Sequence, residues 1–435
     1  LEKLSGKSFG KPENPLLLSV RSGAPISQPG MMNTFLNVGI NVDIVHGIIN
    51  LTQKDWFAWD CYRRFLQSYG MTFGLQRNDF DDIIGDFKNR LGVRYKRDFT
   101  GEQMKKVAMA YKEFILDQGI EIEENPFEQL YLTIKKVFDS WNTSRAKTYR
   151  KIIGISDDWG TAVTVQQMVF GNLTIQSGSG VVFTHSPVWP GDMVNLWGDF
   201  TLGNQGEDVV SGLVKTLPIS SKQARAENRE GQIILETHFP DIYHAVRDFA
   251  KILIYDLKWG PQEMEFTFES PLKKNFFFLQ TRDMAIRERK TVLSFVKTSE
   301  TKSRLLGHGI GVSGGAMAGR AVFNLAELHQ WRELEPKTPL ILVRGDTVPD
   351  DIAEIYEADG LLTGRGGSTS HAAIVAHRLE KTCVVGCASL ICMEKESACS
   401  IDHTVLRAGD WVSIDGREGS VYQGKMEIEE LGGGG

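Results

Sequence analysis

The spacing of apolar positions changes along this chain and divides it into parts of different predicted structure. Apolar residues recur every three to four positions over residues 54–69, 101–118 and 126–143, which predicts three amphipathic helices. From residue 161 onward, short apolar runs are broken by glycine and proline, which is typical of strands. Residues 1–283 are therefore predicted to form a mixed α/β domain with a helical middle.

A second and more compact α/β unit is predicted over residues 305–425. The charged, weakly helical residues 284–304 suit a linker between the two, and residues 426–435 are predicted to be a flexible tail ending in four glycines. Asp415-Gly-Arg-Glu-Gly419 is a turn candidate. The strand candidates of this unit are residues 340–343, 360–363, 383–385, 411–414 and 420–422.

A glycine loop followed by a histidine lies between two of these strand candidates, in Arg365-Gly-Gly-Ser-Thr-Ser-His-Ala-Ala-Ile-Val-Ala-His377. The helix after the loop should begin at Ser370 or His371, with Thr369 or Ser370 as its N-cap. His371 would then lie beside backbone amides and the positive end of the helix dipole. An imidazole there suits attack on a phosphoryl group. The alternative is a capped, partly buried residue without a chemical role.

Carboxylates and apolar residues alternate in Gln262-Glu-Met-Glu-Phe-Thr-Phe-Glu269, and a second strand candidate ends in Leu-Gln-Thr-Arg282. Alternate residues share one face of a strand, so Glu263 and Glu265 would face away from the apolar residues. If the two strands pair, Gln280 and Arg282 join these carboxylates on one surface. That set suits Mg²⁺ bridging between phosphate oxygens. The alternative is a half-exposed hairpin with a polar outer face.

Composition and charge narrow the classes of function. Hydrophobic residues make up 41% of the sequence and charged residues 24%, as in an ordinary soluble globular protein. The net charge of −6 without a long basic run argues against a nucleic-acid partner, and no apolar stretch has the length of a membrane span. The five cysteines include no C-x-x-C pair, which favours reduced thiols in the cytoplasm or, in a plant, a plastid. Because residue 1 is leucine, we expect the sequence to begin inside a longer chain.

The segment G-G-S-T-S-H-A-A resembles the phosphohistidine loop of enzymes that use or make phosphoenolpyruvate, and it is most similar to that of the pyruvate, phosphate dikinase family. The segments E-M-E-F-T-F-E and L-Q-T-R resemble the metal and nucleotide strands of that family's ATP-grasp domain. The resemblance implies an α/β (α+β) fold. In it, an ATP-grasp-like nucleotide-binding domain with a helical insertion precedes a compact swivelling α/β phosphohistidine domain.

The same resemblance implies roles for five residues introduced above. His371 would be the catalytic nucleophile. Glu263 and Glu265 would hold Mg²⁺, and Gln280 and Arg282 would contact ATP or its phosphates.

Earlier segments add candidate ligands of ATP or phosphate. V-R-S-G and P-G-M-M resemble the family's phosphate-side arginine and glycine loop, which implies a phosphate contact for Arg21. F-A-W-D-C-Y-R-R-F resembles a helix that brings an arginine to ATP, so Arg63 and Arg64 are both candidates. Only one of them is expected to reach the site, because adjacent helical residues point in different directions. N-Q-G-E-D-V-V resembles a segment that turns Glu207 towards the nucleotide.

Two residues near the histidine loop each have two interpretations. By resemblance Arg344 helps to orient phosphate, and a structural ion pair is the alternative. Thr369 occupies the position at which plant members of the family are regulated by phosphorylation, and a simple helix cap is the alternative.

The chain also departs from the family pattern. We expect the family's N-terminal loop with its ATP-binding lysine, and its C-terminal barrel for pyruvate and phosphoenolpyruvate, to lie outside this sequence. Glu263 stands where the family commonly has an aspartate, and its side chain is longer. His185 stands where a permanent cation is expected, which would weaken phosphate binding or make it pH-dependent. Ser368 replaces a methionine, a change expected to matter little.

The implied function is a phosphotransferase that converts ATP, inorganic phosphate and His371 to AMP, pyrophosphate and phosphohistidine. The phosphoryl group would then pass to pyruvate, giving phosphoenolpyruvate, on a barrel domain or subunit outside this sequence. Two alternatives stay open: a related phosphotransferase with another acceptor or partner subunit, and a degenerate, non-catalytic ATP-binding relative. A homodimer is the oligomeric state to test.

Overall fold

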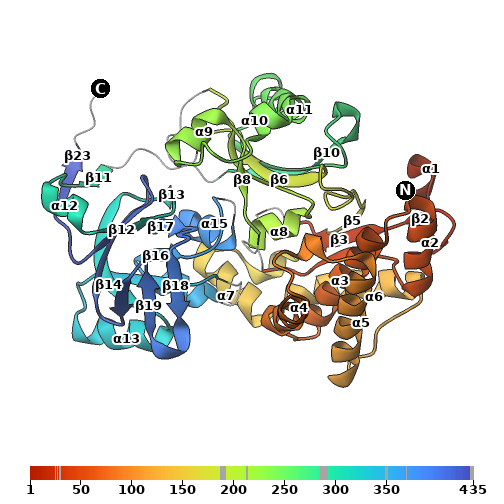
Figure 1. Cartoon of the computed structure of the whole chain (residues 1–435), viewed down its shortest axis with the longest axis horizontal. Helices are drawn as coiled ribbons and strands as arrows, with labels where there is room; N and C mark the ends of the chain where they lie inside the picture. Colours follow the sequence, from red (N-terminus) through yellow and green to blue (C-terminus); the bar gives the residue numbers. More distant parts are fainter. Residues whose placement is uncertain are drawn as a thin grey trace. The chain divides into compact units, whose positions relative to one another are not determined.

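The computed structural model describes residues 1–24, 26, 28, 31–186, 193–211, 214–284, 292–347, 351–368 and 370–431 (Figure 1). The chain divides into two compact units, Leu1–Val169 and Phe170–Gly435. Helices and sheets are mixed in both units, which confirms the predicted α/β class. Among the helices of the described ranges, none is long and apolar enough to cross a bilayer.

The first unit is built on a three-stranded antiparallel sheet in the order β4-β3-β5. The middle strand β3 (Leu18–Ser22) pairs with β4 (Thr34–Val38) and with β5 (Val163–Gln167), which lies at the other end of the unit in sequence. The chain enters this sheet through helix α1 (Glu2–Ser5) and a short parallel pair of strands, β1 (Ser8–Phe9) and β2 (Pro15–Leu16).

Six α-helices connect β4 to β5 in the first unit. The helices predicted over 54–69 and 101–118 are confirmed as α3 and α5. The helix predicted over 126–143 ends earlier, because the Thr143 side chain accepts a hydrogen bond from the Ala146 amide and caps a new helix. Their bounds are α2 (Val42–Thr52), α3 (Asp55–Thr72), α4 (Arg77–Leu91), α5 (Gly101–Asp117), α6 (Pro126–Ser140) and α7 (Ser144–Ile153).

The second unit begins with a five-stranded antiparallel sheet in the order β10-β9-β6-β7-β8. Met264, Phe266 and Phe268 point from one face into an apolar core beneath α11 (Pro240–Lys251), as the alternation predicts. Short helix α8 (Gly206–Ser211) lies on the other side of the sheet (Figure 1). The strands are β6 (Gly178–Phe183), β7 (Trp197–Leu202), β8 (Leu217–Pro218), β9 (Gln262–Phe268) and β10 (Phe276–Asp283), and the remaining helices are α9 (Ser221–Ala226) and α10 (Leu235–His238).

The rest of the second unit surrounds an eight-stranded sheet in the order β12-β22-β21-β14-β15-β16-β17-β13. Strands β14 to β17 run parallel, and the others pair antiparallel. All five strand candidates of the sequence are confirmed, as β15, β16, β17, β21 and β22. The bounds are β12 (Leu305–His308), β13 (Ile310–Ser313), β14 (Ala316–Val322), β15 (Leu340–Arg344), β16 (Gly360–Thr363), β17 (Thr382–Val385), β21 (Trp411–Asp415) and β22 (Ser420–Gln423).

Three helices and a second, smaller sheet complete this part. The sheet is antiparallel, in the order β18-β19-β20, and its buried residues share one core with the eight-stranded sheet. These short strands were not predicted. The elements are α13 (Leu325–Leu334), α14 (Ile352–Glu357), α15 (His371–Arg378), β18 (Leu390–Met393), β19 (Ala398–Ile401) and β20 (Thr404–Arg407).

The segments predicted as linker and tail each contain a strand. β11 (Val292–Phe295) and β23 (Ile428–Leu431) form an antiparallel pair, in which Val292 is the register partner of Leu431. Helix α12 (Ser299–Ser303) follows β11, with Thr298 as its N-cap. The boundaries at 283, 304 and 425 stay predictions.

Candidate active site

Strands β9 and β10 bring the four predicted polar residues together. Across the ladder Arg282 is the partner of Glu263, and Gln280 is the partner of Glu265, with a bulge after Phe278. Arg282 Nε donates to Glu263 Oε1 at 3.0 Å, and Arg282 Nη2 donates to Glu265 Oε1 at 2.7 Å. Gln280 Nε2 donates to the same Glu265 oxygen at 2.6 Å. The convergence predicted from period-two alternation is therefore present.

This hairpin cluster combines buried charge with a partly open edge. Burial raises the pKa of Glu263, while Arg282 opposes the rise. Arg378, from the last turn of α15, also lowers the pKa of Glu263, which places the histidine-bearing helix close to this hairpin. The side chains of Glu265 and Arg282 are 23% and 26% exposed, enough for a ligand to reach them.

The donor set of the hairpin cluster fits Mg²⁺. Glu263 and Glu265 present hard carboxylate oxygens side by side, which are ligands that Mg²⁺ prefers. Within the described ranges no group of three or more histidine, cysteine or acidic side chains is arranged to hold a metal. Two carboxylates with phosphate oxygens and water are the usual way in which proteins hold Mg²⁺ on a nucleotide.

The predicted strand, glycine loop, helix and strand around His371 are confirmed as β16, the loop, α15 and β17. Ser370 is the N-cap, and its Oγ accepts a hydrogen bond from the Ala373 amide, so the helix begins at His371. The Ser370 amide donates to the Gly367 carbonyl, which closes a turn just before the helix. His371 is 6% exposed. Thr369 lies outside the described residues.

Ser368 makes a contact that was not expected. Its Oγ donates to Oδ2 of Asp199, on β7, at 2.7 Å, and both side chains are buried. Serine in place of methionine was expected to matter little at this position. A methionine side chain has no hydrogen-bond donor, so this bond depends on the serine, and the expectation did not include it.

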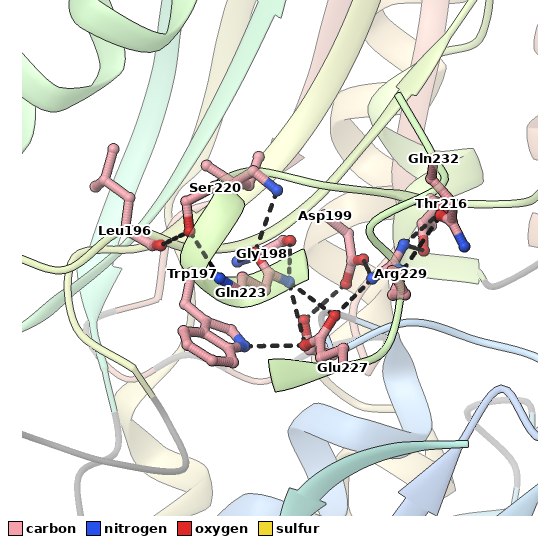
Figure 2. A network of polar contacts seen from close by, with 12 residues as sticks. Leu196, Trp197, Gly198, Asp199, Thr216, Ser220, Gln223, Glu227, Arg229 and Gln232 are labelled. Carbon is pink, nitrogen blue, oxygen red and sulfur yellow. Dashed lines mark hydrogen bonds and ion pairs between the residues drawn. The ribbon is translucent and has the colours of Figure 1, made fainter. Parts of the chain in front are cut away.

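Asp199 belongs to a buried network of polar groups (Figure 2). Arg229 Nη1 lies 3.1 Å from Asp199 Oδ1 and 2.8 Å from Glu227 Oε2, and Arg229 Nη2 donates to the Thr216 carbonyl at 2.6 Å. Trp197 Nε1 donates to Glu227 at 3.0 Å. Burial raises the pKa of Glu227 to about 7, although Arg229 opposes the rise.

Sequence reasoning missed this network. Its signal is a single carboxylate inside the otherwise uncharged strand Trp-Gly-Asp-Phe-Thr-Leu of β7, where a buried charge needs a partner. Nothing in the spacing indicates that the partner is Arg229.

Arg63 and Arg64 lie in α3 of the first unit and share one carboxylate. Arg63 Nε donates to Asp60 Oδ1 at 2.8 Å, and Arg64 Nε donates to Asp60 Oδ2 at 2.9 Å. The two side chains converge on Asp60, because residues three and four positions after it fall on the same side of a helix. The expectation that only one of them reaches ATP stays a prediction. Burial would raise the pKa of Asp60, but Arg64, Lys96 and Arg63 hold it well below its ordinary value.

The remaining candidates are placed as follows. Arg21, on β3, donates from Nη2 to Gln166 Oε1 on β5 at 2.8 Å. Glu207 lies in the first turn of α8. Arg344, at the end of β15, forms ion pairs with Asp351, Glu354 and Glu394, as its structural alternative predicts. Their roles towards phosphate and ATP stay predictions.

His185, expected to stand in place of a cation, is buried just after β6. Its Nδ1 lies 2.8 Å from Thr184 Oγ1, within hydrogen-bond distance. The Pro29-Gly30 part of the predicted glycine loop lies outside the described residues.

Comparison with known proteins gives two matching family models. The model described as pyruvate phosphate dikinase, AMP/ATP-binding domain, matches residues 2–239. The model described as PEP-utilising enzyme, mobile domain, matches residues 336–419, which include the histidine loop.

Curated relatives match almost the whole chain. Pyruvate, phosphate dikinase of Clostridium symbiosum is 36% identical over 464 residues, which cover 99% of this chain and 51% of the relative. The protein of the same name from Rhizobium meliloti is 36% identical, over 98% of this chain and 50% of the relative. The chloroplastic pyruvate, phosphate dikinase of Mesembryanthemum crystallinum is 35% identical, over 98% of this chain and 46% of the relative. The chain thus spans about half the length of the curated relatives it matches.

Proposed function

Because this chain belongs to the pyruvate, phosphate dikinase family, we propose that it catalyses the ATP-dependent phosphorylation of its own His371. The observation that carries the proposal is the hairpin cluster of Glu263, Glu265, Gln280 and Arg282, within the same compact unit as the histidine loop. Together they supply a nucleophile, a cation for phosphate charge and a pair of metal-binding carboxylates.

The proposed reaction has two steps that balance. A neutral imidazole nitrogen of His371 attacks the β-phosphorus of ATP, and the bond to the bridging oxygen of the α-phosphate breaks, so AMP leaves. Inorganic phosphate then attacks the γ-phosphorus of the pyrophosphoryl group on histidine. Pyrophosphate departs, and one phosphoryl group stays on His371. Dividing the transfer in this way is the usual gain of covalent catalysis.

The residues of the site would act mainly by positioning and by charge. Arg282 neutralises phosphate oxygens, and Gln280 orients them, while Glu263 and Glu265 hold Mg²⁺. When bound, Mg²⁺ would offset negative charge on the phosphates as it shifts during transfer. The helix dipole and the backbone amides at the start of α15 would stabilise the phosphohistidine. Pyruvate, which the relatives' names include, is the final acceptor that we propose.

Labelled ATP tests this proposal. With Mg²⁺ and phosphate present, label from the β-phosphoryl position should become bound to the protein in an acid-labile, base-stable form. Label from the γ position should remain on the protein only without phosphate, and adding phosphate should release it as pyrophosphate. Retention of the γ label in the presence of phosphate would contradict the dikinase reaction.

The matched controls are two histidine variants. His371→Ala should abolish labelling. His403→Ala removes a side chain that is 97% exposed and should leave labelling unchanged. Absence of β label on the wild-type protein would favour the degenerate relative.

A further inference from the structure

We propose that Asp199 is a positioning residue that holds the histidine loop in place for reaction with ATP. This inference rests on the proposed function. Ser368 lies three residues before His371, and its Oγ donates a hydrogen bond to Asp199 Oδ2 at 2.7 Å. Asp199 is fully buried and Ser368 is 3% exposed, so water does not compete for this bond.

A second observation supports this position of the loop against Asp199 and Thr216, the two residues that form its seat. A Cβ atom added to Gly367 would lie 2.5 Å from Asp199 Oδ2 and 2.8 Å from Thr216 Oγ1. Such distances are impossible for a side chain without displacement of its neighbours. The glycine therefore lets the loop backbone approach Asp199 and Thr216 directly, and Ser368 fixes the approach with a hydrogen bond.

The network around Asp199 fixes the orientation of its carboxylate. Arg229 holds the other oxygen, Oδ1, and is itself held by Glu227 and by the Thr216 carbonyl (Figure 2). Oδ2 is thereby directed at the loop. Since β7 pairs with β6, and β6 pairs with β9, the seat and the hairpin cluster are parts of one sheet.

The functional consequence follows from the short distance in sequence between Ser368 and His371. Ser370, directly before His371, caps α15, and its amide donates to the carbonyl of Gly367, directly before Ser368. A backbone hydrogen bond thus ties the neighbour of Ser368 to the neighbour of His371. Fixing Ser368 therefore fixes the imidazole relative to the hairpin. A single hydrogen bond can also be broken and remade, as transfer of the phosphoryl group to a second site requires.

The test separates docking of the loop from reactivity of the imidazole. Ser368→Ala removes the donor and leaves the Asp199–Arg229 pair intact, Ser368→Thr keeps the hydroxyl, and exposed Ser389→Ala is the matched control. The single-turnover rate of labelling by ATP should fall about tenfold in Ser368→Ala and recover in Ser368→Thr. Labelling by phosphoramidate, a small donor that needs no ATP site, should be unchanged in all three.

Hydrogen–deuterium exchange gives a readout independent of ATP chemistry. Amides 366–371 should exchange faster in Ser368→Ala than in the wild type, the Thr variant or the Ser389 control. Equal exchange and equal ATP labelling in Ser368→Ala would overturn the inference, as would an equal loss of labelling by ATP and phosphoramidate. If ATP fails to label even the wild type, the proposed function fails, while exchange still decides whether Ser368 docks the loop.

Discussion

Arg282 and Glu263 face each other across the β9–β10 ladder, and Nε of the arginine lies 3.0 Å from Oε1 of the glutamate. The guanidinium also reaches Glu265, so one cation bridges two carboxylates. Binding of a nucleotide with Mg²⁺ would change these contacts: the two carboxylates would bind the metal, and the arginine would bind the phosphates.

Glu263→Gln should therefore weaken metal binding. Loss of one carboxylate ligand should raise the Mg²⁺ concentration for half-maximal labelling of His371 by at least about tenfold. A Mg²⁺ titration of the labelling rate measures this effect. Glu269→Gln is the control, because the Glu269 side chain accepts a hydrogen bond from the Phe170 amide, which glutamine can also accept. An unchanged Mg²⁺ dependence in Glu263→Gln would count against the metal site.

Gly367→Ala should disrupt the seat of the histidine loop. The new methyl group would lie 2.5 Å from Asp199 Oδ2, so the loop must move away. The rate of labelling by ATP should fall by about tenfold or more. Gly345→Ala is the control, because its added Cβ meets Cys392 Cβ at an ordinary contact distance of 3.6 Å. Labelling of Gly367→Ala at the wild-type rate would show that close approach of the loop is not needed.

Asp60→Asn should destabilise the first unit. The substitution leaves Arg63 and Arg64 buried without their shared counter-charge, which should cost about 3–5 kcal/mol in the free energy of unfolding. Urea denaturation measures this loss, with exposed Asp117→Ala as the control.

The pH dependence of Asp60 gives a second check. The pKa of Asp60 in the folded state is lowered from 3.8. The charged Asp60 side chain therefore stabilises the fold above pH 3.8, and this stabilisation is lost as pH falls below that value. The stability difference between the wild type and Asp60→Asn should therefore shrink in acid. A difference that stays constant would contradict the lowered pKa.

Glu227 should produce the opposite pH dependence. Its pKa is raised from 4.5 to about 7, so between these values the native state holds a proton that the unfolded state has released. The free energy of unfolding should then fall as pH rises through this window, by up to about 1.4 kcal/mol per pH unit. Glu227→Gln should remove this slope and exposed Glu230→Gln should keep it, as measured by denaturation at pH 5, 6 and 7. A slope that survives in Glu227→Gln must come from another group.

The parts of the site that the sequence predicts are those governed by local periodicity. Alternation is enough to place Glu263 with Glu265 on one face of β9 and Gln280 with Arg282 on one face of β10, and a hydroxyl before an apolar stripe is enough to locate the start of α15 at His371. These rules act within a strand or one helical turn, and they do not predict the bulge after Phe278. Without that shift of one residue, Gln280 would pair with Met264 instead of Glu265 and would lie on the apolar face.

The parts that could not be predicted depend on contacts between distant segments. Asp199 meets Arg229 and Ser368 only because the fold brings β7, the segment after α9 and the histidine loop together. Strands β18 to β20 are short, and their burial comes from the core they share with the eight-stranded sheet. The pattern of a few residues carries little information about such partners.

The pairing of Val292 with Leu431 places the two ends of the part that carries the histidine loop side by side. A module whose two ends meet can be cut out of one chain and inserted into another with little disturbance to its host. The β11–β23 pair thus gives this part the geometry that recombination needs to transfer it between proteins as a single piece.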